Sequence, residues 1–245
     1  MPIHTEAIVV AAGKGTRLGG PIAKSMKILG DKPLFAYSLS AFERNGRIGG
    51  IILVVPSEEI TTASHWINKL HFTKVKAVVP GGLERGDSVQ KGLSALSLET
   101  QWVAIHDGAR PFVSAALIDR VLDKAFEVGG AIPIVPLADT VKEVRNDHII
   151  GTIDRTILGA AQTPQIFAKA RLLEAYRLAA EHDAKATDDA DIVQRFATGP
   201  IAAIQGESGN FKITTPEDWQ RAVAAVQRLR LSRSSELQPR HKIKE

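Results

Sequence analysis

The chain has 245 residues, 44% hydrophobic and 24% charged, and is long enough to bury a sizeable core. It contains no cysteine, which excludes disulfides, thiolate nucleophiles and cysteine-ligated zinc and favours a reducing compartment, expected to be the cytoplasm. Because no apolar run has the length of a membrane span and the first residues show no secretory signal, we expect no membrane association.

The net charge of +4 is confined to the C-terminal end. Residues 228–245 hold six Lys/Arg and two Asp/Glu, and the preceding residues hold 25 of each sign. A balanced body with a basic tail that lacks aromatic residues is not typical of a nucleic-acid surface. We therefore predict no nucleic-acid partner and a disordered tail over residues 231–245.

The first strand-like run, residues 7–11, ends in a small-residue loop with several cations. Gly13 and Gly15 follow the run directly, and Arg17 and Lys24 come after them. Backbone amides of such a loop can wrap a polyphosphate while Arg and Lys neutralise it. The loop lacks the leading glycine of a P-loop and the third glycine of a dinucleotide fingerprint. A tight structural turn is the alternative, but the spaced cations favour a phosphate site.

Short apolar runs alternate with amphipathic, helix-length segments along the first 135 residues. Strands are predicted at 7–11, 51–55, 75–79, 102–106 and 131–135, and helices near 34–45, 58–70, 87–98 and 115–128. Ser57 and Ser114 stand where N-caps are expected. This order predicts an α/β fold, a mostly parallel twisted sheet with helices on both faces, in one domain spanning residues 1–230. The functional loops then gather at the carboxyl ends of the strands.

Residues 138–158 break this alternation. Two short alternating stretches flank Arg145-Asn146-Asp147 and predict a β-hairpin with too little apolar content for a core element. We interpret it as a projecting arm. A hairpin without a role is the alternative, but its isoleucines would expose apolar surface, which favours a partner, here a second copy in a homodimer.

The rest of the chain continues with helices and strands. Helices are predicted near 168–181 and 188–196, strands near 201–205 and 211–214, and a further helix from Thr215-Pro216-Glu217-Asp218.

Two further loops follow predicted strands. In GGLERGDS, residues 81–88, Arg85 and Ser88 could bind the polar edge of a ligand, although a capped helix start explains the same residues. In HDGARP, Asp107 at a buried strand end is the hard oxygen ligand that Mg²⁺ requires, and an Asp–Arg pair with Arg110 is the alternative. We interpret His106 as a packed, hydrogen-bonded residue.

Three later stretches complete the candidate site. Gln162-Thr163-Pro164-Gln165 predicts an extended polar turn, and the acids of TDDA, residues 187–190, are explained by helix capping rather than by metal binding. Lys212 lies in the predicted strand 211–214, where an apolar setting requires an anion such as phosphate. Separated cations, one acid and a glycine loop, without a nucleophile–base pair, indicate phosphoryl or nucleotidyl transfer.

The ordered motifs resemble those of the 2-C-methyl-D-erythritol 4-phosphate cytidylyltransferase family, which has a glycosyltransferase-A-like nucleotidyltransferase fold. The resemblance spans residues 7–220 and rests on AAGKGTR…K, GGLERGDSV, HDGARP, DTVK, Asp154-Arg155, QTPQIF, TDDA and NFKITTPED. It implies that CTP and a sugar-alcohol phosphate, methylerythritol phosphate, give a cytidyl diphosphate alcohol and pyrophosphate. The reaction would use Mg²⁺ and belong to non-mevalonate isoprenoid synthesis.

The resemblance also implies roles for individual residues. The implied catalytic cations are Arg17, Lys24 and Lys212. The residues implied in CTP binding are Ala11, Ala12, Gly13 and Gly15 at the triphosphate and Gly82, Arg85 and Ser88 at cytosine. Asp107 would orient Mg²⁺. The acceptor would contact Thr140, Arg155, Thr163 and Lys212, the first two reaching over from the other subunit of a dimer through the arm.

One position departs from the family pattern, because Ala23 precedes Lys24 where proline is usual. Loss of proline would loosen the backbone that aims this lysine. Ribitol-5-phosphate cytidylyltransferases share most of the motifs and are the alternative enzyme. A non-catalytic dimeric CTP-binding protein also stays open, whereas a nicotinamide dehydrogenase fails on the missing glycine.

Overall fold

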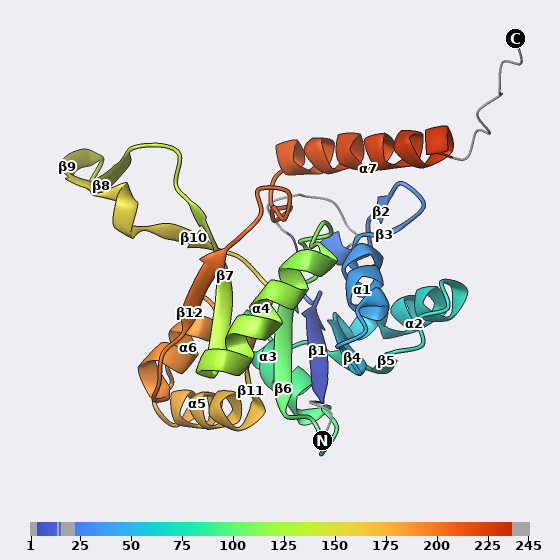
Figure 1. Ribbon diagram of the computed structural model, residues 1–245, viewed down its shortest axis with the longest axis horizontal. Coiled ribbons are helices and arrows are strands. Elements are labelled where there is room, and N and C mark those ends of the chain that lie inside the picture. Colours follow the sequence, from blue (N-terminus) through green and yellow to red (C-terminus); the bar gives the residue numbers. More distant parts are fainter. Residues whose placement is uncertain (1–3, 14, 16–22, 237–245) are drawn as a thin grey trace, which may run out of the picture.

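The computed structural model describes residues 4–13, 15 and 23–236. Its central sheet has the strand order β10-β7-β11-β6-β1-β4-β5, and β12 pairs with β7 (Figure 1). The strands are β1 (Thr5–Val10), β4 (Gly50–Val55), β5 (Val75–Pro80), β6 (Trp102–Asp107), β7 (Gly130–Pro136), β10 (Gly159–Ala161), β11 (Gln165–Ala168) and β12 (Ala202–Gln205). Among the described strands of this sheet, β10 and β11 run antiparallel to the other six, so the mostly parallel sheet is confirmed.

The strands are apolar on both faces because helices cover both sides of the sheet. Along β1, Ala7 and Val9 belong to one core layer and Ile8 belongs to the other, as the twofold repeat of a strand requires. The first layer includes side chains of α1 (Leu34–Arg44), α2 (Ile60–Lys69) and α4 (Ala115–Val128). The second includes side chains of α3 (Arg85–Ser94), α5 (Lys169–Glu181) and α6 (Asp189–Phe196).

Helix starts follow the predicted caps only in part. Ser114 caps α4, because its hydroxyl accepts a hydrogen bond from the Leu117 amide at 2.9 Å. Ser57 instead begins a short 3₁₀ helix, Ser57–Glu59, and α2 starts at Ile60 without a side-chain cap. The Ser57 prediction is therefore wrong.

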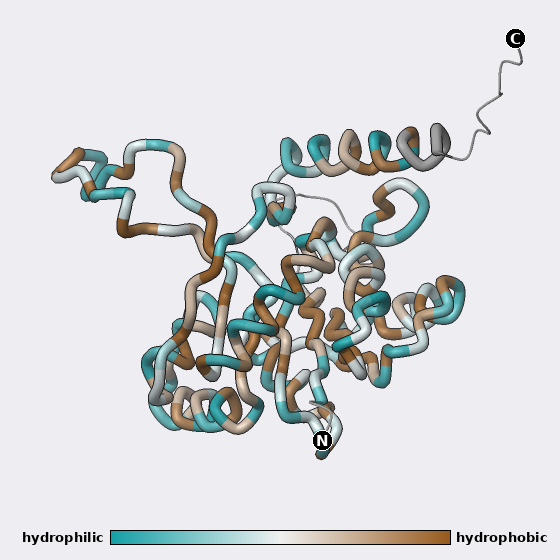
Figure 2. Tube along the Cα trace, in the orientation of Figure 1, coloured by the Kyte–Doolittle hydropathy of each residue, from teal (hydrophilic) through white to brown (hydrophobic). Residues whose placement is uncertain are grey.

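The predicted hairpin is present as β8 (Val141–Arg145) and β9 (His148–Ile153). Asn146 and Asp147 form its turn with φ of 49° and 62°, the left-handed pair that matches strand twist in a two-residue loop. Figure 1 shows it extending away from the sheet, and Figure 2 shows hydrophobic segments within it. Among these, Ile149 is 67% exposed and Val144 is 60% exposed.

The C-terminal part differs from the prediction at two places. Residues 211–214 are not a strand but a loop that leads into α7 (Pro216–Glu236). Helix α7 packs Ala222 and Val226 against Leu29 and Ile213, and the small hairpin of β2 (Ile28–Leu29) and β3 (Lys32–Pro33) lies beside it. Residues 231–236 of the predicted disordered tail belong to this helix, and 237–245 lie outside the described residues.

None of the helices described combines the length and the apolar character needed to cross a membrane.

Candidate active site

A cavity of about 220 Å³ lies where β1 and β6 end. It is lined by Val10, Ala11, Gly13, Gly15, Lys24, Ser25, Arg85, Asp107, Ala109, Lys212 and Thr214. These come from five separate stretches of the chain, as expected when parallel strands end at one edge of a sheet. Three of the lining residues are cationic and one is anionic, so among the described residues the cavity favours a polyanionic ligand.

The predicted phosphate loop forms one wall of this cavity. Gly15 has a φ of +64°, and a Cβ at this position would lie 2.5 Å from Cβ of Lys24, so glycine allows the close approach. The Ser25 hydroxyl donates to the Ala11 carbonyl at 2.6 Å and ties the loop to the segment that carries Lys24. Arg17, the second predicted cation of the loop, lies outside the described residues.

Ala12 marks the contact between this loop and the GGLERGDS loop. A Cβ on Gly81 would lie 2.2 Å from Cβ of Ala12, so the two loops can pack only because residue 81 is glycine. Ala12 is therefore beside the cavity wall rather than part of its lining.

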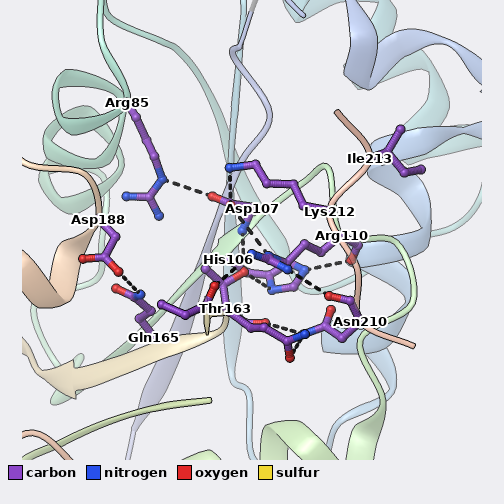
Figure 3. A network of polar contacts seen from close by, with 12 residues as sticks. Arg85, His106, Asp107, Arg110, Thr163, Gln165, Asp188, Asn210, Lys212 and Ile213 are labelled. Atoms are coloured by element: carbon purple, nitrogen blue, oxygen red, sulfur yellow. Dashed lines mark hydrogen bonds and ion pairs between the residues drawn. The ribbon is translucent and has the colours of Figure 1, made fainter. Parts of the chain in front are cut away.

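The carboxylate of Asp107 is the centre of the site (Figure 3). Arg85 Nε lies 3.0 Å from Oδ1, whereas Lys212 Nζ at 2.8 Å and Arg110 Nε at 3.8 Å face Oδ2. Burial alone would raise the pKa of Asp107, but these three cations outweigh it and hold the pKa well below its usual range. Asp107 is therefore an anion that gathers the cations of three loops.

The backbone behind Asp107 is held by a buried hydrogen-bonded chain. His106 Nε2 lies 3.0 Å from the Arg110 carbonyl, so this nitrogen carries the proton and Nδ1 accepts from the Thr163 hydroxyl at 3.0 Å. The same hydroxyl accepts from the Asp107 amide at 3.0 Å. Burial lowers the pKa of His106 to about 4, which keeps the ring neutral. His106 is thus a packed, hydrogen-bonded residue, as the sequence indicated.

Arg85 is shared between Asp107 and a second acid that the sequence interpretation did not assign to the site. Its NH2 group lies 2.7 Å from Oδ2 of Asp189, which is completely buried at the start of α6. The Tyr176 hydroxyl donates to the other oxygen of Asp189 at 2.6 Å. The predicted capping role in TDDA belongs to Asp188, whose carboxylate accepts from the Asp191 amide at 2.9 Å.

The two other predicted base-binding residues are engaged within their own loop. Ser88 Oγ accepts from the Gly82 amide at 3.0 Å, and Glu84 and Asp87 form a capping box at the start of α3. A Cβ on Gly82 would lie 2.1 Å from Cβ of Asp87, so glycine is required here. The capped helix start is thus observed, and recognition of a base by these residues stays a prediction.

Lys212 reaches the cavity from the loop 211–214. Ile213 next to it donates its amide to the Ala109 carbonyl at 2.9 Å and accepts from Lys24 Nζ at 2.7 Å. Ile213 therefore holds Lys24 through its carbonyl and stands next to Lys212 in the chain, which links two lysines that are far apart in the sequence. Ala23, before Lys24, has φ of −52° and ψ of 133°, which are angles that proline also adopts.

Thr140 and Arg155 do not line the cavity. Both are exposed in the arm region, and the Arg155 guanidinium donates to the Ala138 carbonyl. Thr163 is buried behind Asp107 and is also absent from the lining. Within one chain, the structure thus gathers the predicted phosphate-loop and acid residues but leaves the predicted arm residues apart from them.

The residues present fit a metal ion only as a shared site. Among the described residues no cluster of three or more His, Cys, Asp or Glu side chains is suited to a metal. Mg²⁺ is commonly held by one or two carboxylates together with substrate phosphates and water. The single lining carboxylate, Asp107, is compatible with that arrangement.

Known proteins of one family are similar to this chain over most of its length. The family model of 2-C-methyl-D-erythritol 4-phosphate cytidylyltransferase matches residues 5–228. The enzyme of that name from Desulforamulus reducens is 42% identical over 224 residues, covering 91% of this chain and 95% of the relative. The one from Geobacillus kaustophilus is 41% identical over 216 residues, covering 88% and 94%.

Solved structures give the same result. The 4-diphosphocytidyl-2C-methyl-D-erythritol synthase from Anaerococcus prevotii superposes with a TM-score of 0.82 at 28% identity and covers 92% of this chain and 97% of its own. The 2-C-methyl-D-erythritol 4-phosphate cytidylyltransferase from Thermus thermophilus gives 0.74 at 30% identity, covering 90% and 98%. The family match spans the described sheet, both core layers and the cationic cavity, and the chain belongs to the 2-C-methyl-D-erythritol 4-phosphate cytidylyltransferase family of nucleotidyltransferases.

Proposed function

We propose that this protein transfers the cytidylyl group of CTP to 2-C-methyl-D-erythritol 4-phosphate. The observation that carries the proposal is the convergence of Lys24, Arg85 and Lys212 with Asp107 at one cavity in a chain of this family. A phosphate oxygen of the acceptor bonds to the α-phosphorus of CTP. The bond from that phosphorus to the bridging oxygen breaks, and pyrophosphate leaves with the electron pair. Such a displacement needs positioning and charge neutralisation, which a cationic cavity provides.

The phosphate loop is the proposed triphosphate site. Its small residues leave the backbone open to the cavity, and Lys24 stands where it can neutralise charge that develops during the transfer. Arg17 is proposed for the same task from its place in the AAGKGTR motif. Gly82, Ser88 and Arg85 are proposed to contact cytosine.

Mg²⁺ is the proposed cofactor, and Asp107 is the residue that would hold it together with the triphosphate. When bound, the ion would neutralise phosphate charge and orient the leaving pyrophosphate. Arg85, Lys212 and Arg110 hold the Asp107 carboxylate in its ionised form, which is the form that binds a cation.

The acceptor phosphate is proposed to bind Lys212 and Thr163 of one chain and Thr140 and Arg155 of its partner. Support comes from the arm, whose hydrophobic side chains are exposed in the single chain. A twofold homodimer joined through the arms would cover that surface and bring each Arg155 toward the other subunit's cavity.

The cytoplasmic location, expected from the cysteine-free sequence, also stays a proposal.

The relatives cited above favour methylerythritol phosphate over ribitol 5-phosphate, because each is named for the methylerythritol compound. Pyrophosphate release is the measurement that tests the proposal. The protein is incubated with CTP, Mg²⁺ and either sugar-alcohol phosphate, and we expect release with methylerythritol phosphate. Release with ribitol 5-phosphate alone would identify the other transferase, and CTP binding without release from either would indicate a binding protein.

A further inference from the structure

The loop that carries Lys212 is held by the backbone bond from the Ile213 amide to the Ala109 carbonyl and by side-chain contacts. Because residues 211–214 are not in the sheet, the ladder hydrogen bonds that would locate a lysine on a strand are replaced by other contacts. Lys212 nevertheless lies 2.8 Å from Asp107, on a different loop. The Ile213–Ala109 bond holds the chain after Lys212, and contacts of the residues before Lys212 must hold it on the other side.

Asn210, two residues before Lys212, is a buried polar residue directly preceding this loop (Figure 3). It is completely inaccessible, and its Nδ2 donates to the Thr163 carbonyl at 2.8 Å and approaches Gln162 Oε1 at 3.4 Å. Its own carbonyl accepts from Arg110 NH1 at 2.9 Å. Asn210 thus connects the loop to the Gln162-Thr163 dipeptide and to an arginine of the HDGARP motif.

The same dipeptide holds the other end of the ion pair. The Thr163 hydroxyl accepts from the backbone amide of Asp107 at 3.0 Å. Thr163 therefore anchors both partners of the ion pair. Its carbonyl binds the Asn210 side chain, two residues before Lys212, and its hydroxyl binds the Asp107 amide.

We propose that Asn210 is a positioning residue, which places Lys212 for the acceptor phosphate by anchoring its loop to Thr163. The inference rests on the proposed role of Lys212 in binding that phosphate. It assigns Asn210 no contact with substrate, because the side chain points into the protein and bonds to the Thr163 backbone.

The chemistry of this position requires an amide rather than an acid. The two oxygens near Nδ2, the Thr163 carbonyl and Gln162 Oε1, are acceptors. The side chain at position 210 must therefore donate, which an ionised carboxylate does not do. Among the described groups none donates to Asn210 Oδ1, which is also buried. Asn210→Asp keeps the shape, removes the donor and directs negative charge at the Thr163 carbonyl, so the loop and Lys212 should shift.

A double-mutant cycle with Lys212 tests the proposal. The parent, Asn210→Asp, Lys212→Ala and the double variant are compared for kcat and for KM of methylerythritol phosphate and of CTP. We expect Asn210→Asp to lower kcat/KM for the acceptor on the order of 100-fold, the scale of a misplacement of about 1 Å, with little change in KM for CTP. In the Lys212→Ala background the same substitution should have a much smaller effect.

Asn45→Asp is the matched control. Asn45 is also a buried asparagine whose Nδ2 donates, here to Asp119 at 2.8 Å, but it precedes β4, at the edge where the strands begin. It should lower the midpoint of thermal unfolding and leave kcat/KM for the acceptor unchanged. If Asn210→Asp does not fold, Asn210→Ala replaces it in the same cycle.

The outcomes separate the inference from the function beneath it. Three outcomes would each overturn the positioning role. In the first, Asn210→Asp lowers kcat/KM for the acceptor equally with and without Lys212. In the second, KM for CTP rises as much as kcat/KM for the acceptor falls, and in the third a folded variant keeps the kcat/KM of the parent. A parent protein that releases no pyrophosphate with either acceptor would instead refute the proposed function.

Discussion

Two inactive variants of this protein should restore activity to each other if the active site is shared across a dimer. Lys24 lines the cavity of its own chain, whereas Arg155 lies in the arm, in the short 3₁₀ helix Arg155–Ile157 that follows β9. Lys24→Ala and Arg155→Ala each remove one proposed contact and should each be nearly inactive. The two variants are unfolded together, refolded as an equal mixture and assayed for pyrophosphate release.

The size of the recovery follows from the symmetry. Random pairing makes about half of the dimers mixed, and each mixed dimer has one doubly damaged site and one site with Lys24 and Arg155 both intact. Roughly a quarter of all sites should therefore work. If each variant alone is reduced on the order of 100-fold, the mixture should exceed either of them about 25-fold.

A second mixture provides the control. Lys24→Ala and Lys212→Ala both damage the cavity of the chain that carries them, since both side chains line it. Every site of a mixed dimer then keeps one lesion, and no recovery is expected. The shared site would be refuted if mixed dimers were present and the mixture of Lys24→Ala with Arg155→Ala stayed as inactive as this control.

Three further predictions concern single residues. Lys24→Ala should lower kcat on the order of 100-fold while CTP affinity, measured by calorimetry, changes little. Lys124→Ala, at a half-buried position on α4 outside the cavity lining, is the control. Chelation should stop pyrophosphate release, and added Mg²⁺ should restore it. Asp107→Asn should raise the Mg²⁺ concentration required or abolish activity. Full activity in excess chelator would contradict the metal role. Burial lowers the pKa of His106 from 6.5 to about 4, so its contribution to stability is complete above pH 6.5 and is lost as the pH falls toward 4. Denaturant titrations should show the free energy of unfolding decreasing by about 2 kcal/mol between pH 8 and pH 5, and His106→Gln should flatten this slope.

The parallel part of the fold was predictable because each of its strands carries its own signal. The run 51–55 is apolar on both faces, and β4 is buried throughout, so the sequence pattern and the packing report the same property. The arm was predictable from its polarity and its Asn-Asp turn. Strands β10 and β11 were not predicted, because three- and four-residue stretches carry too short a pattern to separate from a loop.

The cavity was predictable to the extent that its residues follow strands. Asp107 and Gly13 stand directly after apolar runs, and the edge of a parallel sheet brings such positions together whatever the distance along the chain. The pairing of Arg85 with Asp189 gave no comparable signal. An acid at a helix start is fully explained by capping, so only the contacts seen in the structure show that Asp188 caps the helix while Asp189 binds the arginine.

Lys212 shows how an expected charge partner can be found although the predicted local structure is wrong. The alternation of Phe211, Lys212 and Ile213 indicated a strand, and the apolar setting indicated an anion nearby. The structure places the lysine in a loop beside a carboxylate, because Ile213 enters the core with α7 and Asn210 bonds to the Thr163 carbonyl. The side chains of Lys212 and Asn210 bond to residues far away in the sequence, and neither contact can be deduced from local periodicity. A lysine in an apolar stretch predicts an opposite charge nearby irrespective of the backbone, so an anion beside Lys212 was expected although the predicted strand is absent, and its role toward a phosphate stays a prediction.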